Sequence, residues 1–163
     1  MSRYLDELDT AAVPLRADQR ILGALGPRMA ALAGARAAGV HPFLVPPDAT
    51  AGYRQVLGPS ALLAPHLAVV LESDPDRART IARDSIGMFV AMPSYRSNLH
   101  RLGFTAAGTA PGGSGRLTDA IVARGDIDSV FARVSQHLDA GADHVALHVL
   151  AGTPARRPAS GAN

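Results

Sequence analysis

The chain has 163 residues with no cysteine or tryptophan; 47% of them are hydrophobic, 18% are charged, and the formal net charge is +2. This composition excludes a disordered polymer, a disulfide scaffold and a protein built on zinc thiolates or a catalytic cysteine. The basic residues are all arginines spread from Arg3 to Arg157 between acidic residues, so no nucleic-acid-binding stripe is expected. No signal peptide and no membrane span is recognisable, so we expect one soluble, cytoplasmic domain.

Short apolar runs alternate with amphipathic segments along the chain. The apolar runs predict four strands, at residues 20–25, 40–45, 64–71 and 143–150. Helices are expected between them, beginning after Ser2, at Pro27, at Asp48, at Asp74-Pro75, near Tyr95 and after the two caps Ser114 and Asp126. Glycines are expected to end four of these helices, namely Gly39, Gly58, Gly103 and Gly141.

Two stretches lack helical or strand periodicity. Residues 105–115 are rich in glycine, alanine and threonine and are expected to form a mobile loop, in which Gly112-Gly113-Ser114-Gly115 resembles a phosphate loop only superficially because no strand precedes it. Residues 153–163 form a polar tail that we expect to be disordered. The domain is therefore assigned to residues 1–152.

Strands that alternate with helices favour a parallel sheet with right-handed crossovers. Four strands are too few for a closed (β/α) barrel, which needs about 250 residues. The inner face of such an open sheet is expected to be apolar, formed by residues such as Leu22, Leu44, Val69 and Ala146 or by their alternating neighbours, because strands buried on both sides show little alternation.

The turn from Gly23 to Met29 joins a strand to a helix, a geometry in which backbone N–H groups at the helix start attract phosphate. On spacing alone an ordinary strand-to-helix turn is the favoured interpretation, because neither a Walker sequence nor a full dinucleotide fingerprint is present.

Several polar and aromatic residues are expected near the ends of these strands. His41 can face a cofactor ring, bond a substrate, or be a structural histidine satisfied by backbone. The candidates for the wall of a substrate pocket are Phe43, Tyr95, Asn98 and His148, although Tyr95 and Asn98 also fit a solvated helix face. His144 and His148 are expected to point into the barrel interior while Val145, Leu147 and Val149 pack outward; the two histidines lie about 13 Å apart along a strand, so no metal site is predicted.

A resemblance to a known family is carried by several stretches in order: Tyr4-Leu5-Asp6 with Leu8-Asp9, residues 20–29, residues 39–43, Asn98-Leu99 with residues 101–104, and residues 137–145. Together they resemble the C-terminal half of the luciferase-like (LLM class) oxidoreductases and monooxygenases, (β/α)-barrel enzymes that use flavin or a deazaflavin. The most similar branch is the actinobacterial one that depends on the deazaflavin coenzyme F420.

The resemblance implies a parallel half-barrel, the C-terminal portion of a TIM-barrel luciferase-like fold, and hydride transfer with coenzyme F420, or alternatively FMN. It also implies that Leu25, Gly26, Pro27, Arg28 and Met29 bind the cofactor phosphate, and His41 is included among the cofactor-binding residues. No residue is assigned as catalytic acid or base.

The first four strands of the family have no counterpart in the chain. We therefore expect the isolated chain to be inactive, and to form a homodimer or to associate with a complementary half-barrel. The alternatives are a non-catalytic half-barrel that serves as a binding or assembly module, and a truncated translation product.

Overall fold

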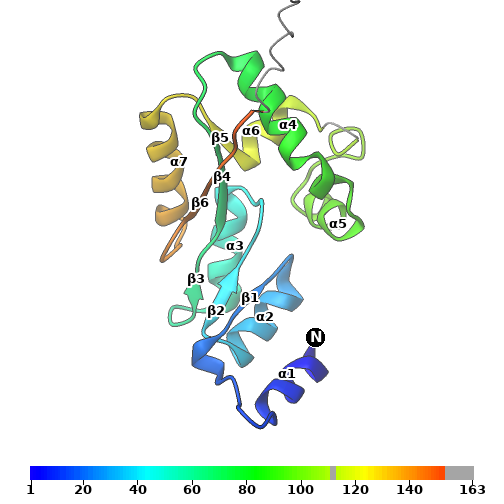
Figure 1. Cartoon of the computed structure of the whole chain (residues 1–163), viewed down its shortest axis with the longest axis vertical. Helices are drawn as coiled ribbons and strands as arrows, with labels where there is room; N and C mark the ends of the chain where they lie inside the picture. The colour runs from blue at the N-terminus through cyan, green and yellow to red at the C-terminus, as the bar shows by residue number, and fades with distance from the viewer. Residues whose placement is uncertain (111–112, 153–163) are drawn as a thin grey trace, which may run out of the picture.

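The computed structural model describes residues 1–110 and 113–152. The predicted disordered tail, residues 153–163, lies outside the described residues. The helices are α1 (Ser2–Asp9), a 3-10 turn η1 (Ala17–Gln19), α2 (Pro27–Arg36), α3 (Pro47–Leu57), α4 (Pro75–Ala91), α5 (Pro93–Arg101), α6 (Gly115–Ile121) and α7 (Ile127–Asp139). The strands are β1 (Ile21–Gly23), β2 (Gly39–His41), β3 (Leu62–Leu63), β4 (His66–Val70), β5 (Val122–Arg124) and β6 (Ala146–Val149). Figure 1 shows them in an elongated arrangement with helices on both sides of the strands.

The strands form two parallel three-stranded ladders, β1-β2-β3 and β5-β4-β6. The ladders are continuous, because the amide groups of Ala64 and His66 donate to the carbonyl groups of Val40 and Pro42 at 3.0 and 2.8 Å. Residues 62–70 therefore act as one long central strand interrupted at Pro65. The predicted fold class, an α/β protein with a parallel sheet, is confirmed.

The two edges of this central strand have different neighbours. The amide of Leu62 donates to the carbonyl of Ala38 on the β2 side, and the carbonyl of Val70 accepts from the amide of Gly125 after β5. The backbone groups of the even-numbered residues therefore form their hydrogen bonds along one edge of the strand. The carbonyls of Leu63 and Val69 accept from Asp143 and Leu150 beside β6. In spatial order the sheet therefore runs β1, β2, the central strand and β6, and β5 adds to the central strand beyond the end of β2.

Each face of the sheet packs on its own helices. Val40 and Leu63 are buried against α2 and α3, while Leu67 and Val69 are buried against Val130 of α7; we call this side the outer face. On the opposite side, the inner face, Ala68 and Val70 pack against α4 and α6. In Figure 1, α4 and α7 accordingly lie on opposite sides of β4 and β5.

The handedness of parallel crossovers accounts for this division. A strand, helix, parallel strand connection is right-handed in nearly all proteins, so reversing the direction of travel across the sheet moves the helix to the other face. The chain crosses from β4 to β5 through α4, α5 and α6, and then returns past β4 to β6 through α7. The helices of the two crossovers must therefore cover opposite faces.

The predicted helix starts are confirmed at three caps. Asp74 accepts from the amides of Asp76 and Arg77, Ser114 accepts from Leu117, and Asp126 accepts from Ser129. Asp48 is not the cap that we predicted: α3 already begins at Pro47, and Asp48 lies within its first turn. Proline suits the first helical position because its fixed φ is helical and no N–H is lost there.

The strand prediction needs three corrections. The strand β5 was missed, because its three residues lie between two helices and have no apolar run of their own. The predicted 64–71 strand is replaced by β3 and β4, which Pro65 separates. The 40–45 strand ends already at His41, and Leu44 adopts a positive φ of 54°.

The residues predicted for the inner face divide between the two faces. Leu44 packs in the inner-face core, and Ala146 pairs with His66 of that face, whereas Leu22 and Val69 belong to the outer face, where they pack under α2 and α7. Of the outward-packing residues predicted in the last strand, Val145 is packed beneath α7, but Leu147 and Val149 are 54% and 58% exposed. Leu147 and Val149 thus leave an uncovered apolar strip on the outer face at the β6 edge.

The predicted loop at residues 105–115 includes hydrogen-bonded turns. Thr109 is buried, and its hydroxyl group lies 3.0 Å from Nε2 of His100. Its backbone amide donates to the carbonyl of Thr105. These contacts fix Thr109 against the end of α5.

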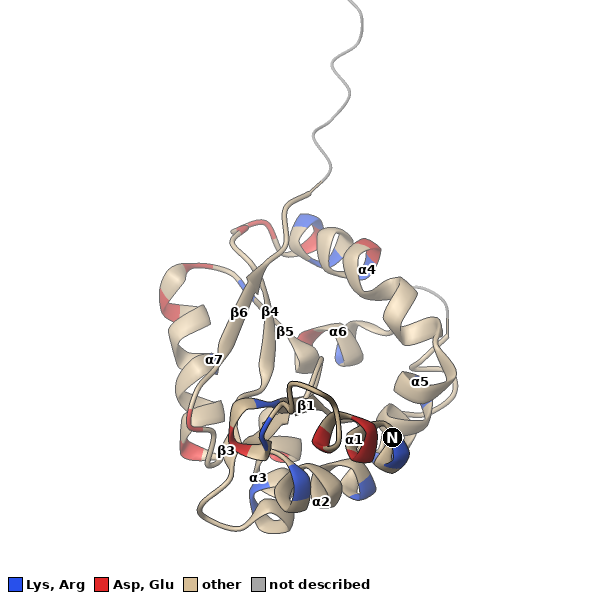
Figure 2. Cartoon of the chain, turned by 60° about the horizontal axis from the view of Figure 1, so that its bottom comes forward, with Lys and Arg blue, Asp and Glu red and all other residues tan. Residues whose placement is uncertain are grey.

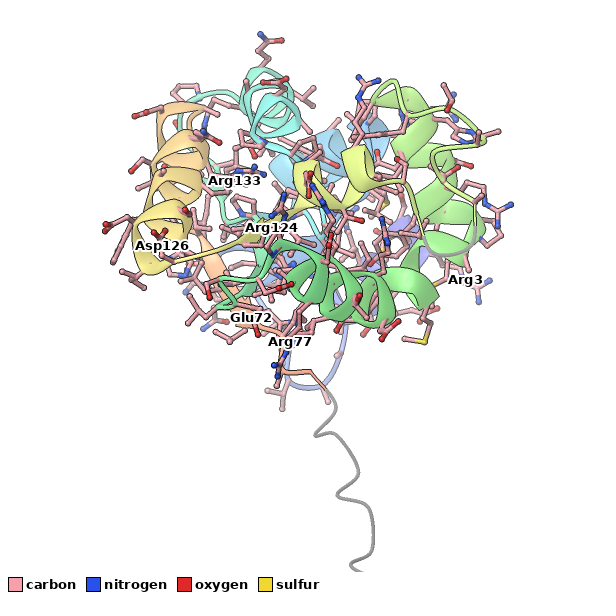
Figure 3. All side chains as sticks on the ribbon, turned by 90° about the horizontal axis from the view of Figure 1, so that it is seen from above. Arg3, Glu72, Arg77, Arg124, Asp126 and Arg133 are labelled. Atoms are coloured by element: carbon pink, nitrogen blue, oxygen red, sulfur yellow. The ribbon has the colours of Figure 1, made fainter. Side chains whose placement is uncertain are left out.

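Ion pairs join the helices over the surface. Glu72 and Arg77 lie side by side at the start of α4, and Arg124 and Arg133 both approach the region between α6 and α7 (Figure 3). Arg124 pairs with Asp119 at 2.8 Å, and Arg133 donates to the carbonyl groups of Asp119 and Ala120 at the end of α6. Figure 2 shows acidic and basic segments interspersed over the helices. Within the described residues, no helix is both long and apolar enough to cross a membrane.

Gly39 is required for close packing of two strands and does not end a helix as we predicted. A Cβ atom built on it would lie 2.0 Å from the carbonyl oxygen of Leu62 on the neighbouring strand. We therefore expect Gly39→Ala to lower the free energy of unfolding by about 1 to 3 kcal/mol, the range for overpacked interiors. Urea denaturation followed by circular dichroism measures this loss.

Gly87 provides the matched control. It lies inside α4, and a Cβ atom there would meet nothing within 4 Å. Gly87→Ala should therefore raise the free energy of unfolding by about 0.5 to 1 kcal/mol. Equal stability of Gly39→Ala and the unmodified chain would contradict the close-packing account.

Candidate functional site

The turn after β1 is held open by a tyrosine. Gly26 caps α2 with a positive φ of 103°, a conformation that favours glycine. Its amide donates to the hydroxyl of Tyr53 at 2.8 Å, and that hydroxyl donates to the carbonyl of Ala24 at 3.2 Å. Burial is the main reason why the pKa of Tyr53 lies above its usual value, so the hydroxyl stays protonated and keeps both bonds. The turn therefore has a fixed shape.

The start of α2 faces a cationic side chain. A Cβ atom on Gly26 would lie 2.7 Å from Nη2 of Arg101, so the guanidinium group covers the glycine directly. Nη2 of Arg101 also donates to Oδ1 of the buried Asn98 at 3.2 Å. The two residues come from α5, whose end approaches α2 and α3 around a cavity of about 210 Å³. This cavity is lined by Gly26, Pro27, Tyr53, Asn98, Arg101 and Leu102, among others.

The first turn of α2 has free donors for an anion. The opening turn of a helix leaves its amide groups without helical acceptors. Pro27 has no N–H and the amide of Gly26 is taken by Tyr53, so Arg28 and Met29 supply the available amides. The side chain of Arg28 is exposed, whereas that of Met29 packs into the core beneath α2. Leu25 is half-buried beside the glycine.

A second group of residues gathers on the inner face as a cluster of rings. Phe43 stacks on His66 with ring centres 3.7 Å apart, and His41 approaches the His66 ring edge-on at 6.3 Å. Phe89 and Tyr95 contact Phe43 from α4 and α5 at 5.1 and 6.3 Å. We call His41, Phe43, His66, Phe89, Tyr95 and His148 the inner-face ring cluster.

The histidines of this cluster come from three strands. Nδ1 of His41 lies 2.6 Å from the carbonyl of Ala64, which can only accept, so Nδ1 carries the proton. Nε2 of His66 lies 3.3 Å from Nδ1 of His148. His66 is 5% exposed, and burial together with the nearby His148 and His41 lowers its pKa to about 4. His66 is therefore neutral near pH 7.

The structure divides the predicted site residues into two groups. Gly26, Pro27 and Asn98 line the cavity beside α2. His41, Phe43, Tyr95 and His148 belong to the ring cluster. Asn98 thus lines the cavity of the predicted phosphate turn and does not belong to the ring cluster.

Four further residues belong to these two groups and were not predicted from the sequence. Arg101 and Tyr53 sit on helices, and no local pattern links them to the turn that they contact. His66 lies in the predicted 64–71 strand, and Phe89 lies near the end of the helix expected after Asp74-Pro75. A polar residue inside an otherwise apolar strand was the one available signal for His66.

His144 precedes β6 and is exposed, whereas the pairing of His148 with Ala68 places His148 on the inner face as predicted. Gly112 of the glycine-rich stretch lies outside the described residues, and Ser114 caps α6. In the described part of the chain, no three His, Asp or Glu side chains come close enough to hold a metal ion.

Comparison with protein-family profiles and with curated proteins finds no match. Among solved structures, the chain resembles the coenzyme F420-dependent tetrahydromethanopterin reductase from Methanopyrus kandleri, with a TM-score of 0.59 and 21% identity. The match covers 79% of this chain and 44% of that chain. A second similar structure is an F420-dependent secondary alcohol dehydrogenase in complex with an F420-acetone adduct, with a TM-score of 0.54, 16% identity, and coverage of 79% of this chain and 42% of that chain.

These matches confirm, at the level of the fold, the resemblance to F420-dependent luciferase-like enzymes. The chain spans less than half the length of either of these solved structures. Its parallel sheet corresponds to part of their barrel, so the predicted partial barrel is also confirmed as a fold class.

The two buried histidines predict how stability depends on pH. Burial lowers the pKa of both His66 and His137 from 6.5 to about 4. Between these values the unfolded chain binds protons that the folded chain does not bind, so the free energy of unfolding should fall as the pH drops from 6.5 to 4. The full loss is on the order of 3 kcal/mol for each histidine. Above pH 6.5 neither group should contribute any slope.

Urea denaturation at a series of pH values measures this slope. Four carboxyl groups have pKa values below 3.8, so the change in stability that they cause occurs at lower pH than that of the histidines; they are Asp9, Asp119, Asp126 and Asp143. His137→Gln should remove about half of the slope, and His144→Gln, at an exposed position, should leave it unchanged. A stability that stays constant between pH 6.5 and 4.5 would show that these histidines are protonated in the folded chain.

Proposed function

We propose that the chain is the C-terminal half of a luciferase-like oxidoreductase that uses coenzyme F420 for hydride transfer. The observation that carries this proposal is the pairing of a glycine-capped helix start after β1 with the guanidinium group of Arg101, together with a cluster of rings that includes His41 at the end of β2. Ligand sites of barrel enzymes lie at the carboxyl ends of the strands. The F420-dependent enzymes of similar fold support the choice of coenzyme over the alternative FMN.

The residues beside α2 fit a cofactor phosphate. A Cβ atom on Gly26 would collide with Arg101, so the absence of a side chain lets backbone and guanidinium donors face the same point. The amides of Arg28 and Met29 would bind the phosphate oxygens, the helix dipole would favour the negative charge, and Arg101 would supply the opposite charge. Leu25 and Pro27 would fix the path of the turn. Tyr53 would hold it in shape from below.

The ring cluster fits the reacting half of such a site. When bound, the coenzyme would supply a flat ring that accepts or donates a hydride. His41 would contact that ring, because its Nδ1–H is bonded to Ala64 and its Nε2 remains available. Phe43, Tyr95 and His148 would form the apolar and polar walls against which a small substrate lies. These side chains would exclude water from one side of the reacting atoms.

Phosphate binding is tested by removing its charged partner. Arg101→Met should weaken F420 binding by about 10-fold to 100-fold, the value of one charge-assisted hydrogen bond. Gly26→Asp should abolish binding, because it places bulk and negative charge where the anion must lie. Fluorescence titration with F420 measures both effects.

Arg96→Met is the matched control on α5, since Arg96 is exposed and donates to the carbonyl of Ala91. Its affinity for F420 should equal that of the unmodified chain. Unchanged affinity in Arg101→Met and Gly26→Asp, with circular dichroism showing an intact fold, would refute the phosphate assignment. If the chain bound FMN more tightly than F420, the assignment of the phosphate site would stand and the assigned coenzyme would be FMN.

The open sheet favours association. Within the described residues, β1 and β6 each pair along one side only. Leu147 and Val149 on β6 and Phe131 and Leu138 on α7 are between 45% and 62% exposed, and Ile21 on β1 is 47% exposed. Unpaired strand edges and exposed apolar residues favour further strand pairing. We propose that a second copy, or a complementary half-barrel, covers these edges.

Light scattering at micromolar concentration tests this association. The chain should form dimers or larger species, and Val149→Lys should reduce association by placing a charge on the β6 edge. Val13→Lys, at an 88% exposed position outside any helix or strand, should leave association unchanged. A folded monomer that binds no hydrophobic dye would show that the chain needs no partner to cover its sheet.

A further inference from the structure

The cavity that begins at the start of α2 extends between α3 and α5, and the proposed function uses only the part beside α2. Along α3 the cavity is lined by Asp48, Ala49, Gly52, Tyr53 and Val56. Because these residues form two sets with a spacing of four, they share one face of the helix, over a length of about 12 Å at about 1.5 Å per residue. The cavity therefore forms a groove along most of α3.

The part of this groove toward the end of α3 is apolar and open. A Cβ atom built on Gly52 would meet nothing within 4 Å, and the residue is exposed. Val56, one turn further along α3, is 43% exposed, and Leu102 lines the groove from the end of α5. The hydroxyl of Tyr53 is already bonded to the turn before α2, so only its ring is left to the groove. Glycine inside a helix is less stable than alanine, so Gly52 lowers the stability of α3 and leaves this space free.

The part of the groove beside α2 contains an amide donor without a partner. Asn98 is 4% exposed and lines the cavity. Because an arginine can only donate, the atom of Asn98 that lies 3.2 Å from Nη2 of Arg101 is Oδ1, and Nδ2 is the other arm of the amide group. Among the described residues Nδ2 has no hydrogen-bond partner, and it is not one of the unpartnered nitrogen atoms that protein covers completely. Its N–H groups are therefore accessible through the cavity.

Arg101 adds a cation to the same part of the groove. Within residues 1–110 and 113–152, its guanidinium group forms no ion pair and donates to the amide oxygen of Asn98. The free backbone amides of Arg28 and Met29 lie at the start of α2, which this guanidinium group covers. Asp48 is exposed in the first turn of α3, and the α3 residues that follow it in the lining carry no charge. The groove therefore combines donors for an anion with an uncharged, apolar extension.

We propose that this groove binds the organic substituent of a phosphate ester whose phosphate group lies at the start of α2. The inference rests on the proposed function, because it uses the same phosphate site; it adds Asn98 as a phosphate ligand and defines the attached group as compact and apolar. Nδ2 of Asn98 and the guanidinium group of Arg101 donate to the phosphate oxygens, and the substituent covers Gly52 and Val56. A polar substituent would lose its hydrogen bonds to water against these apolar walls.

Titration of the full chain, followed by NMR of its amide groups, tests the groove without any coenzyme. The probes are inorganic phosphate, butyl phosphate, glycerol phosphate and butanol. We expect butyl phosphate to bind at least about 10-fold more tightly than inorganic phosphate or glycerol phosphate, because each buried methylene group contributes about fourfold. The side-chain amide signals of Asn98 and the backbone amide signals of Arg28 and Met29 should shift with all three phosphates. Butanol at the same concentrations should shift none of these signals.

Variants along α3 separate the groove from the phosphate site. Gly52→Leu should fill the groove and reduce the affinity for butyl phosphate to that for inorganic phosphate, which should bind as before. Gly52→Ala should have a smaller effect in the same direction. Gln55→Leu adds the same side chain to α3 at an exposed position outside the cavity, so both affinities should stay unchanged. Asn98→Asp keeps an acceptor for Arg101 but replaces the donor by a negative charge, and should weaken all three phosphates by about 10-fold or more.

The unmodified chain alone decides the outcome, even if every variant fails to fold. Equal affinity for butyl phosphate and inorganic phosphate would overturn the groove and leave the phosphate site intact. Butanol that binds as tightly as butyl phosphate would show an apolar pocket independent of the anion, and would also overturn the proposal. Side-chain signals of Asn98 that do not move with phosphate would overturn its assignment as a ligand. Unmoved signals of Arg28 and Met29 with every phosphate would refute the phosphate site of the proposed function, and the groove with it.

Discussion

The parallel pairing along residues 62–70 is the constraint on which the rest of the molecule depends. One edge of this strand is bonded to β2 and β5, and the other to β6. Its alternate side chains serve two cores, with Leu63, Leu67 and Val69 on the outer face and Ala68 and Val70 on the inner face. Because parallel crossovers are right-handed in nearly all proteins, the position of each helix follows from which edge the next strand joins.

The same constraint assembles the candidate site. Because β1 and β2 are parallel, the turn after β1 and the end of β2 lie along one edge of the sheet, and His66 at the start of β4 is bonded to Pro42 just past the end of β2. The insertion α4 to α6 then brings Tyr95, Asn98 and Arg101 over that edge. The helix α5 therefore contributes both to the cavity beside α2 and to the ring cluster, an arrangement that the proposed cofactor, with a phosphate and a flat ring, would use.

Interactions between residues close in sequence made the helix caps and turns of the fold predictable. The caps Asp74, Ser114 and Asp126 were recognised because a side-chain oxygen before a helix is a local signal. The turn around Gly26 was recognised by its position after a strand. The strand β5 was missed because three residues at the end of a helix carry too little periodicity, and their pairing with β4 is a tertiary contact.

The parts of the site that escaped prediction depend on contacts between distant segments. Arg101 reaches Gly26 across more than seventy positions of sequence, and Tyr53 reaches it from another helix. Gly39 is a residue type that often ends a helix, but here it allows the backbone of Leu62 to approach closely. His66 looks like part of an apolar strand until the sheet register places it beside His148. None of these relations has a signature in the spacing of neighbouring residues.

The account's central claim is that the start of α2, together with Arg101, binds the phosphate of coenzyme F420. The most direct measurement is a pair of fluorescence titrations of the unmodified chain, one with F420 and one with the deazaflavin nucleoside that lacks the phosphate. We predict that F420 binds at least 10-fold more tightly, and that inorganic phosphate competes with it. Equal affinity for the two compounds, or no effect of phosphate, would contradict the claim.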